Sequence, residues 1–148
     1  MTSSVDPTLE MAAIKARLLA LGQPCHEGVP MDYKPPLDGW GRKSPYRDLE
    51  SGSVIPTSLG RGIALAEQSQ PYYWSFQIHH VAPTREQARA LSTASDVSLI
   101  GWEPTTNAGM IRPLYFTMYD ALDDNGEVLE WIASRFYEVA LGQSPELS

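Results

Sequence analysis

One segment constrains the fold more than any other: an alternating aromatic run that leads directly into a helix start. Residues 72–81 read YYWSFQIHHV, with a large apolar side chain at every second position of their first half. Such positions share one face of an extended strand, so the segment predicts a half-buried strand, which Pro83 ends. Thr84 and Gln87 follow at the spacing of a helix capping box. A strand and a helix are therefore expected to pack in adjacent layers.

The remaining elements follow from shorter patterns. Asp6 and Pro7 suit a helix N-cap and first helical residue, an apolar stripe at spacings of three and four runs to Leu21, and Gly22 is a helix stop. Asn-Gly at 125–126 predicts a hairpin turn. Further strands are expected at 24–29, 46–51, 110–119 and within 132–141. We therefore expect an α+β fold: an antiparallel or mixed sheet of four to five strands with two helices packed on one face, in the order α-β-β-β-α-β-β.

Length and composition set the class of protein. The 148 residues suit one domain, 1–148, with flexible ends at 1–6 and 142–148 and a long Pro- and Gly-rich loop at 30–45. The net charge of −7 disfavours wrapping of duplex DNA. The single cysteine excludes an intrachain disulfide. No apolar run approaches the length of a membrane span, and no signal peptide is visible, so a soluble cytoplasmic protein is expected.

The residue types that carry chemistry form no recognisable site. His79 and His80 are neighbours on a strand and point to opposite faces, so they do not share a metal ion easily, and Cys25 with His26 has the same defect. The acidic run at 123–126 lacks the further ligands of a calcium loop and suits a turn. A nucleophile elbow and a phosphate loop are both absent. We expect no enzyme, and no catalytic, metal or cofactor-binding residue.

Two surface features indicate contacts with other molecules. Tyr33 and Trp40 lie on the irregular loop, where aromatic residues either mark a contact surface or fold back over the sheet. The acids near the predicted hairpin either form a solvated tip or repel something negative. The expected interface set is Tyr33, Trp40, Arg42, Lys43, Ile63 and Leu65. The acidic set is Asp120, Asp123, Asp124 and Glu127.

Several segments together resemble a known family. They are IKARLL at 14–19, PYRDL at 45–49, YWSFQI at 73–78, VAPTREQAR at 81–89, LIGW at 99–102 and FY at 136–137. Between residues 9 and 142 the chain resembles the tail terminator (tail completion) proteins of long-tailed, siphovirus-type bacteriophages, particularly phages of actinobacteria. The shared segments are packing and turn patterns, and none is a catalytic motif.

The resemblance implies a structural virion protein without a cofactor. Six copies would form a homohexameric ring that caps the tail tube, stops its polymerisation and offers a docking surface for the head–tail connector. Its partners would be the major tail tube protein and the connector or stopper protein. DNA would pass through the ring without specific binding, with the acidic set facing the lumen. The location would be the tail–neck junction of the virion, and the host cytoplasm during assembly. The alternatives are another neck protein (head-closure, stopper or head–tail adaptor) and a small enzyme or ligand-binding domain.

Overall fold

The computed structural model describes residues 6–29, 33–37, 41–56, 72–122 and 125–142, and these contain two helices and one five-stranded sheet. In chain order the elements are α1 (Thr8–Leu19), β1 (Cys25–His26), β2 (Tyr46–Pro56), β3 (Tyr72–Ala82), α2 (Arg85–Leu99), β4 (Arg112–Leu122) and β5 (Val128–Leu141). The predicted α+β class and the order α-β-β-β-α-β-β are confirmed.

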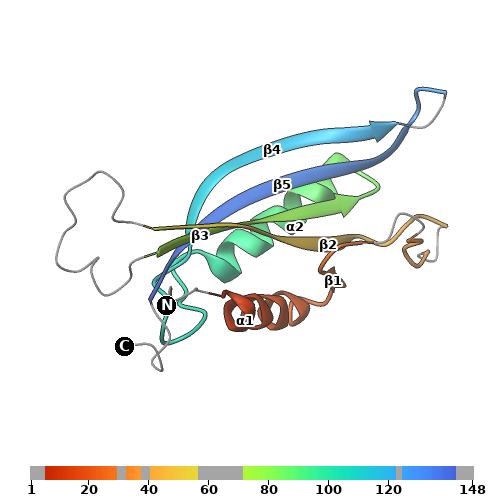
Figure 1. Cartoon of the computed structure of the whole chain (residues 1–148). Coiled ribbons are helices and arrows are strands. Elements are labelled where there is room, and N and C mark those ends of the chain that lie inside the picture. The colour runs from red at the N-terminus through yellow and green to blue at the C-terminus, as the bar shows by residue number, and fades with distance from the viewer. Residues whose placement is uncertain (1–5, 30–32, 38–40, 57–71, 123–124, 143–148) are drawn as a thin grey trace.

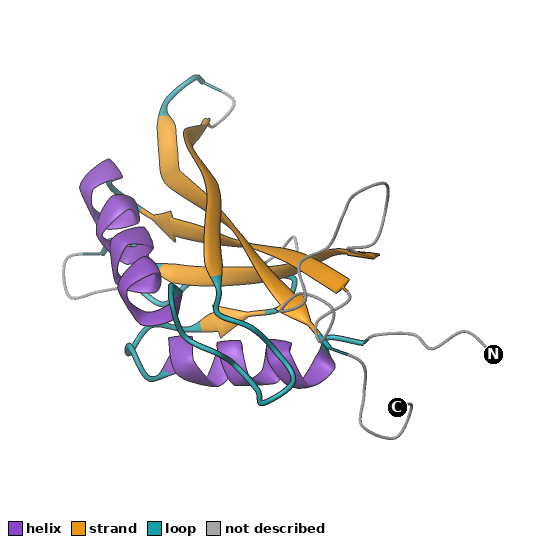
Figure 2. Ribbon diagram, turned by 90° about the vertical axis from the view of Figure 1, so that its left-hand side faces the viewer, coloured by secondary structure: helices purple, strands orange, loops and turns teal. Residues whose placement is uncertain are grey.

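The sheet has the strand order β1-β2-β3-β5-β4. The short β1 pairs parallel with β2, and every other pair of neighbours is antiparallel. The two helices lie against one side of the sheet, and the opposite side carries no helix (Figures 1 and 2). The β4–β5 hairpin extends beyond the layer of helices (Figure 2).

β3 runs through the centre of the sheet and supplies the core. Trp74, Phe76 and Ile78 are fully buried on the helix side, which confirms the face predicted from their alternation. The Trp74 and Phe76 rings stack with centroids 4.8 Å apart, and Phe76 stacks on Tyr137 of β5 at 5.1 Å. The Trp74 Nε1–H donates to Ser51 Oγ at 3.0 Å, so the indole is both packed and hydrogen-bonded.

α2 begins where the capping box of Thr84 and Gln87 predicts. Thr84 Oγ1 accepts a hydrogen bond from the Gln87 N–H at 3.2 Å, and Gly101 takes the positive φ of +86° that a glycine tolerates after a helix end. Val97 and Ile100 lie off the packed face, and they are 81% and 39% exposed. The buried stripe runs through Ala88, Leu91, Ser92, Ser95 and Leu99. Val97 lies two residues after Ser95, which is about 200° around a helix, so it faces solvent.

α1 begins at Thr8, one residue later than predicted, with Pro7 as its N-cap. The Thr8 N–H still donates to Asp6 Oδ1 at 3.0 Å. Asp6 therefore accepts a hydrogen bond from the first turn although it lies one residue before the N-cap. Ile14 and Leu18 are buried in the main core as their spacing predicts. Leu21 lies beyond the end of the helix and is 36% exposed.

The strand bounds differ from the predicted ones: β1 covers only two residues of the expected 24–29, β4 is shifted forward from the expected 110–119, and β2 and β5 are several residues longer than predicted. β2 continues to Pro56 because an irregularity between Ser51 and Val54 interrupts the alternation without ending the pairing with β3. β5 begins at Val128, four residues before the predicted Ile132. The predicted hairpin turn is confirmed: Leu122 pairs with Val128, and Gly126 has a φ of +81°.

Candidate assembly surface

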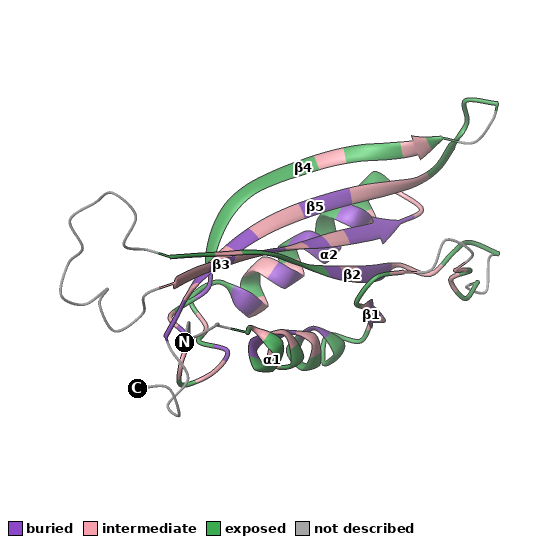
Figure 3. Ribbon diagram, in the orientation of Figure 1, coloured by how far each residue is buried: buried purple, intermediate pink, exposed green. Residues whose placement is uncertain are grey.

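The edge strand β4 leaves large apolar side chains in solvent along most of its length. Only Met118 and Ala121 of its eleven residues are partly buried (Figure 3). α2 packs mainly against β3 and β5, which leaves most of β4 without a helical cover. The exposed apolar residues of the hairpin are Leu114, Tyr115, Phe116, Tyr119 and Leu122 of β4, and Val128 and Leu129 of β5, each 40–58% exposed. Such a concentration on one hairpin marks a contact surface.

The face of the sheet that carries no helix continues this surface. The Tyr115 and Phe136 rings stack across β4 and β5 with centroids 4.3 Å apart. Arg112 of β4 forms an ion pair with Glu138 of β5, and its guanidinium lies 5.5 Å from the centroid of the Tyr73 ring on β3. This face, which we call the open face, therefore joins aromatic rings with paired charges.

A hydrogen-bonded relay crosses the open face from β5 to β2. Ser134 Oγ lies 2.6 Å from His79 Nδ1, and His79 Nε2 lies 3.2 Å from Glu50 Oε2. Gln77 also donates to Glu50 Oε2, at 2.8 Å. The three residue types are those of a catalytic triad, and sequence analysis did not connect them because 84 residues separate Glu50 from Ser134.

The surroundings of the relay do not suit nucleophilic catalysis. Ser134 is only 2% exposed, so its hydroxyl is closed to a substrate. It lies inside β5, where β3 and β4 on either side take up the backbone N–H groups that an oxyanion hole would need. We interpret the relay as a set of contacts that fixes the register of β2, β3 and β5.

The neighbouring histidine belongs to a different, buried network. His80 points to the helix side, as the alternation predicts, with its Nδ1 2.7 Å from the carbonyl oxygen of Ala133 and its Nε2 2.7 Å from Ser95 Oγ. Burial, with a smaller effect from Arg47, lowers the pKa of His80 to about 3. The imidazole is therefore neutral at neutral pH, and its Nδ1–H donates to Ala133 while the Ser95 hydroxyl donates to Nε2.

Arg47 completes this network from β2. Its side chain is fully buried, and its Nε–H donates to Ser95 Oγ at 2.8 Å. Its two terminal nitrogens donate to Gln23 Oε1 at 2.9 Å and to the carbonyl oxygen of Leu91 at 3.1 Å. Burial lowers the pKa of Arg47, and the neutral acceptors around the guanidinium satisfy its hydrogen bonds. The network ties α2 to β2 and to the segment after α1.

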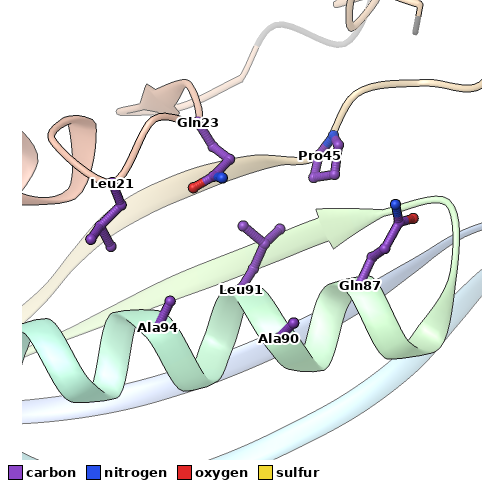
Figure 4. A pocket seen from close by; sticks show the side chains of 7 residues that line it. All are labelled: Leu21, Gln23, Pro45, Gln87, Ala90, Leu91 and Ala94. Carbon is purple, nitrogen blue, oxygen red and sulfur yellow. The ribbon is translucent and has the colours of Figure 1, made fainter. Parts of the chain in front are cut away.

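A groove of about 300 Å³ lies between the end of α1, the start of β2 and α2 (Figure 4). Its lining consists of Leu21, Gln23, Pro45, Gln87, Ala90, Leu91 and Ala94. The short side chains of Ala90 and Ala94 on α2 leave room for the groove. Gln23 and Gln87 are the polar residues of an otherwise apolar lining. None of the described residues that line the groove is a nucleophile or a titratable group, and what they offer a partner is apolar contact and the hydrogen bonds of two amides.

The predicted interface residues that the structure describes, Tyr33, Arg42 and Lys43, lie at the opposite edge of the sheet from the hairpin. Tyr33 is half-buried, and its ring meets His26 at 4.7 Å and Tyr46 at 5.1 Å between centroids. Burial raises the pKa of Tyr46 to about 12. Arg42 and Lys43 are exposed, and an antiparallel bridge pairs Lys43 with Leu37. Trp40, Ile63 and Leu65 lie outside the described residues.

The two predicted acidic residues that the structure describes lie at the hairpin tip. Asp120, near the end of β4, and Glu127, just before β5, are both exposed. Asp123 and Asp124 lie outside the described residues. The hairpin tip and the loop with Arg42 and Lys43 stand at the same end of the sheet but on opposite edges (Figure 1). Within one chain, Arg42 and Lys43 therefore do not lie beside Asp120 and Glu127.

No family model matches the chain, and no curated protein matches it either. Among the described residues, no three histidine, cysteine or acidic side chains are grouped as a metal site would require. Within the same residues, neither helix has the length and apolar character of a membrane span.

The surface that sequence analysis missed is the open face with the exposed hairpin. Residues 110–119 did carry a signal, because Tyr115 and Tyr119 alternate with Leu114, Phe116 and Met118, so both faces of the strand are apolar. A strand with two apolar faces at a sheet edge needs a further partner for at least one of them.

Proposed function

We propose that the chain is a structural virion protein, a tail terminator whose copies assemble into a ring on the end of a phage tail tube. The observation that carries the proposal is the β4–β5 hairpin, with seven large apolar side chains 40–58% exposed at the edge of the sheet. The resemblance of residues 9–142 to tail terminators supplies the context for this surface. A subunit that acts by contact rather than by catalysis needs such an uncovered edge.

The architecture and the charge of the chain support the same function. A ring is built from heterologous contacts, in which one patch of a subunit meets a different patch of the next, and an exposed sheet edge supplies one such patch. The resemblance implies six copies, which at 16.4 kDa each give a ring of about 98 kDa. A net charge of −7 per chain lowers the affinity of the ring for DNA phosphates, so DNA slides through without being held.

A tube-elongation assay tests the proposal. The purified chain is added to its cognate tail tube protein during polymerisation, and tube lengths are measured by negative-stain electron microscopy. We expect shorter tubes with added density at one end. A Tyr115→Ser, Leu122→Ser variant should lose this effect, while Val97→Ser, which removes an apolar side chain 81% exposed on α2, should keep it. Unchanged tube lengths and bare tube ends with the native chain would refute the function.

The same assay separates the neck-protein alternative. A head-closure, stopper or adaptor protein would use its exposed hairpin on the connector side and leave tube growth unaffected. Binding to the isolated connector without any effect on tube length would therefore favour that alternative over the terminator.

A further inference from the structure

The sheet has two free edges, and they differ in character. The outer edge of β4 has no strand partner among the described residues, because β4 is the last strand of the order β1-β2-β3-β5-β4. On the other side, β1 pairs with β2 only at Arg47 and Asp48. The described part of the chain therefore leaves the outer edge of β2 unpaired from Leu49 to Pro56. Free strand edges are templates for pairing with another strand.

The directions of the two edge strands are compatible. β2, β3, β5 and β4 are successively antiparallel, so β4 runs opposite to β2. If a second copy is placed beside the first in the same orientation, β4 of one copy meets β2 of the next as an antiparallel pair. This contact joins two different edges, so it can repeat from copy to copy and close a ring.

Charge determines which end of one edge meets which end of the other. One row of paired residues crosses the sheet through Tyr46, Val81, Ile132 and Tyr119. Among its described residues, the loop before Tyr46 carries the exposed cations Lys34, Arg42 and Lys43, and the same segment of the sequence also contains Asp32 and Asp38. Directly after Tyr119, the hairpin tip carries the exposed acids Asp120 and Glu127. Copies in the same orientation thus bring an acidic tip to the level of a basic loop.

We propose that the partner of the β4 edge is the outer β2 edge of a second copy of this chain, with the acidic tip of one copy on the basic loop of the next. The ring that results from repeating this contact rests on the proposed function, but the contact itself does not. A two-fold pairing of β4 with β4 is the competing arrangement, and it yields dimers only. In this contact Asp120 and Glu127 lie at a subunit boundary, whereas sequence analysis predicts them to face the lumen.

Cysteine cross-linking tests the contact. Thr117→Cys on β4 is combined with either Glu50→Cys or Ser53→Cys on β2; all three positions are exposed, and the native Cys25 is buried. Within one chain, β4 and β2 lie three strand spacings apart, about 14 Å, which is beyond the reach of a disulfide. Under oxidation, we expect a ladder of dimers, trimers and higher multimers for at least one pair, and nothing above a dimer for each single variant.

Two results of this experiment would overturn the inference. One is that both double variants stay monomeric under oxidation. The other is a Thr117→Cys single variant that gives as much dimer as the double variants while no higher multimer forms, which would establish the β4–β4 pairing instead.

A charge exchange tests the orientation of the contact. Asp120→Lys with Glu127→Lys, or Arg42→Glu with Lys43→Glu, should each lower the multimer yield about tenfold at low salt. The chain that carries all four changes should recover it, and circular dichroism melting checks that every variant folds. If the acids face only the lumen, the multimer yield of the chain with all four changes will not recover, and that outcome contradicts the proposed orientation.

The two proposals fail in different ways. If cross-linked ladders form but the native chain has no effect on tube growth, the edge contact is supported and the terminator function is refuted. If the native chain terminates tubes but neither cysteine pair gives a multimer, the terminator function is supported and the edge contact is refuted.

Discussion

The buried His80 gives the chain a pH dependence of stability whose size follows from the structure. The side chain is fully buried, and burial lowers its pKa from 6.5 to about 3. Between these values the unfolded chain holds a proton on His80 that the folded chain excludes. The stability is therefore fully present above about pH 6.5 and is lost as the pH falls toward 3. From pH 7 to pH 5 the loss amounts to about 2 kcal/mol at 25 °C.

Replacing the imidazole with a neutral amide isolates this contribution. His80→Gln keeps a donor and an acceptor but cannot bind a proton in this range. Urea unfolding, followed by tryptophan fluorescence at pH 7 and pH 5, gives the free energy of unfolding for each chain. We expect the native chain to lose about 2 kcal/mol more than the variant between the two pH values. The carboxylates titrate in both chains, so their effect cancels in the difference.

The neighbouring histidine provides a matched control. His79→Gln removes an imidazole from the open face of the same strand and leaves His80 in place, so this variant should retain the His80-dependent loss. Equal losses in the native chain and in His80→Gln would refute the reasoning, because they would show that His80 titrates alike in the folded and unfolded chains.

Three further predictions concern packing and assembly. Trp74→Ala removes a fully buried, stacked indole and should lower the free energy of unfolding by about 3–5 kcal/mol, measured by urea titration; a loss below about 1 kcal/mol would contradict the core assignment. Gly52→Ala places a Cβ 2.7 Å from the Ser75 carbonyl oxygen and should cost about 1–3 kcal/mol in the same titration, so an unchanged midpoint would argue against the close approach of β2 and β3. Tyr115→Ser with Leu122→Ser should leave the thermal midpoint nearly unchanged while multimer formation falls, and a collapse of stability would show that the hairpin supports the monomer.

Local patterns predicted the centre of this fold well. The alternation of 72–81 identified β3 and its buried face, and the capping pair Thr84 and Gln87 located the start of α2. These features depend on neighbours in the sequence. The end of β2 depends on pairing with β3 across an irregularity at Ser51 and Val54, which the sequence alone does not reveal.

The candidate surface was harder to predict because it depends on strand order. Tyr115 meets Phe136, and Ser134 meets His79, only because β5 lies between β3 and β4. Arg42 and Lys43 of the irregular loop are exposed, and their role as interface residues stays a prediction. That this loop lies at the same end of the sheet as Asp120 follows only from the register of four strands. The sequence alone therefore did not predict these contacts between distant residues.

We propose that this chain acts as a structural collar at the end of a tail tube. Cryo-electron microscopy of virions that carry the chain tests this proposal. We expect a single ring of this fold between the last tube layer and the head–tail connector. Density for the chain elsewhere in the particle, or no density for it at all, would refute the proposed function.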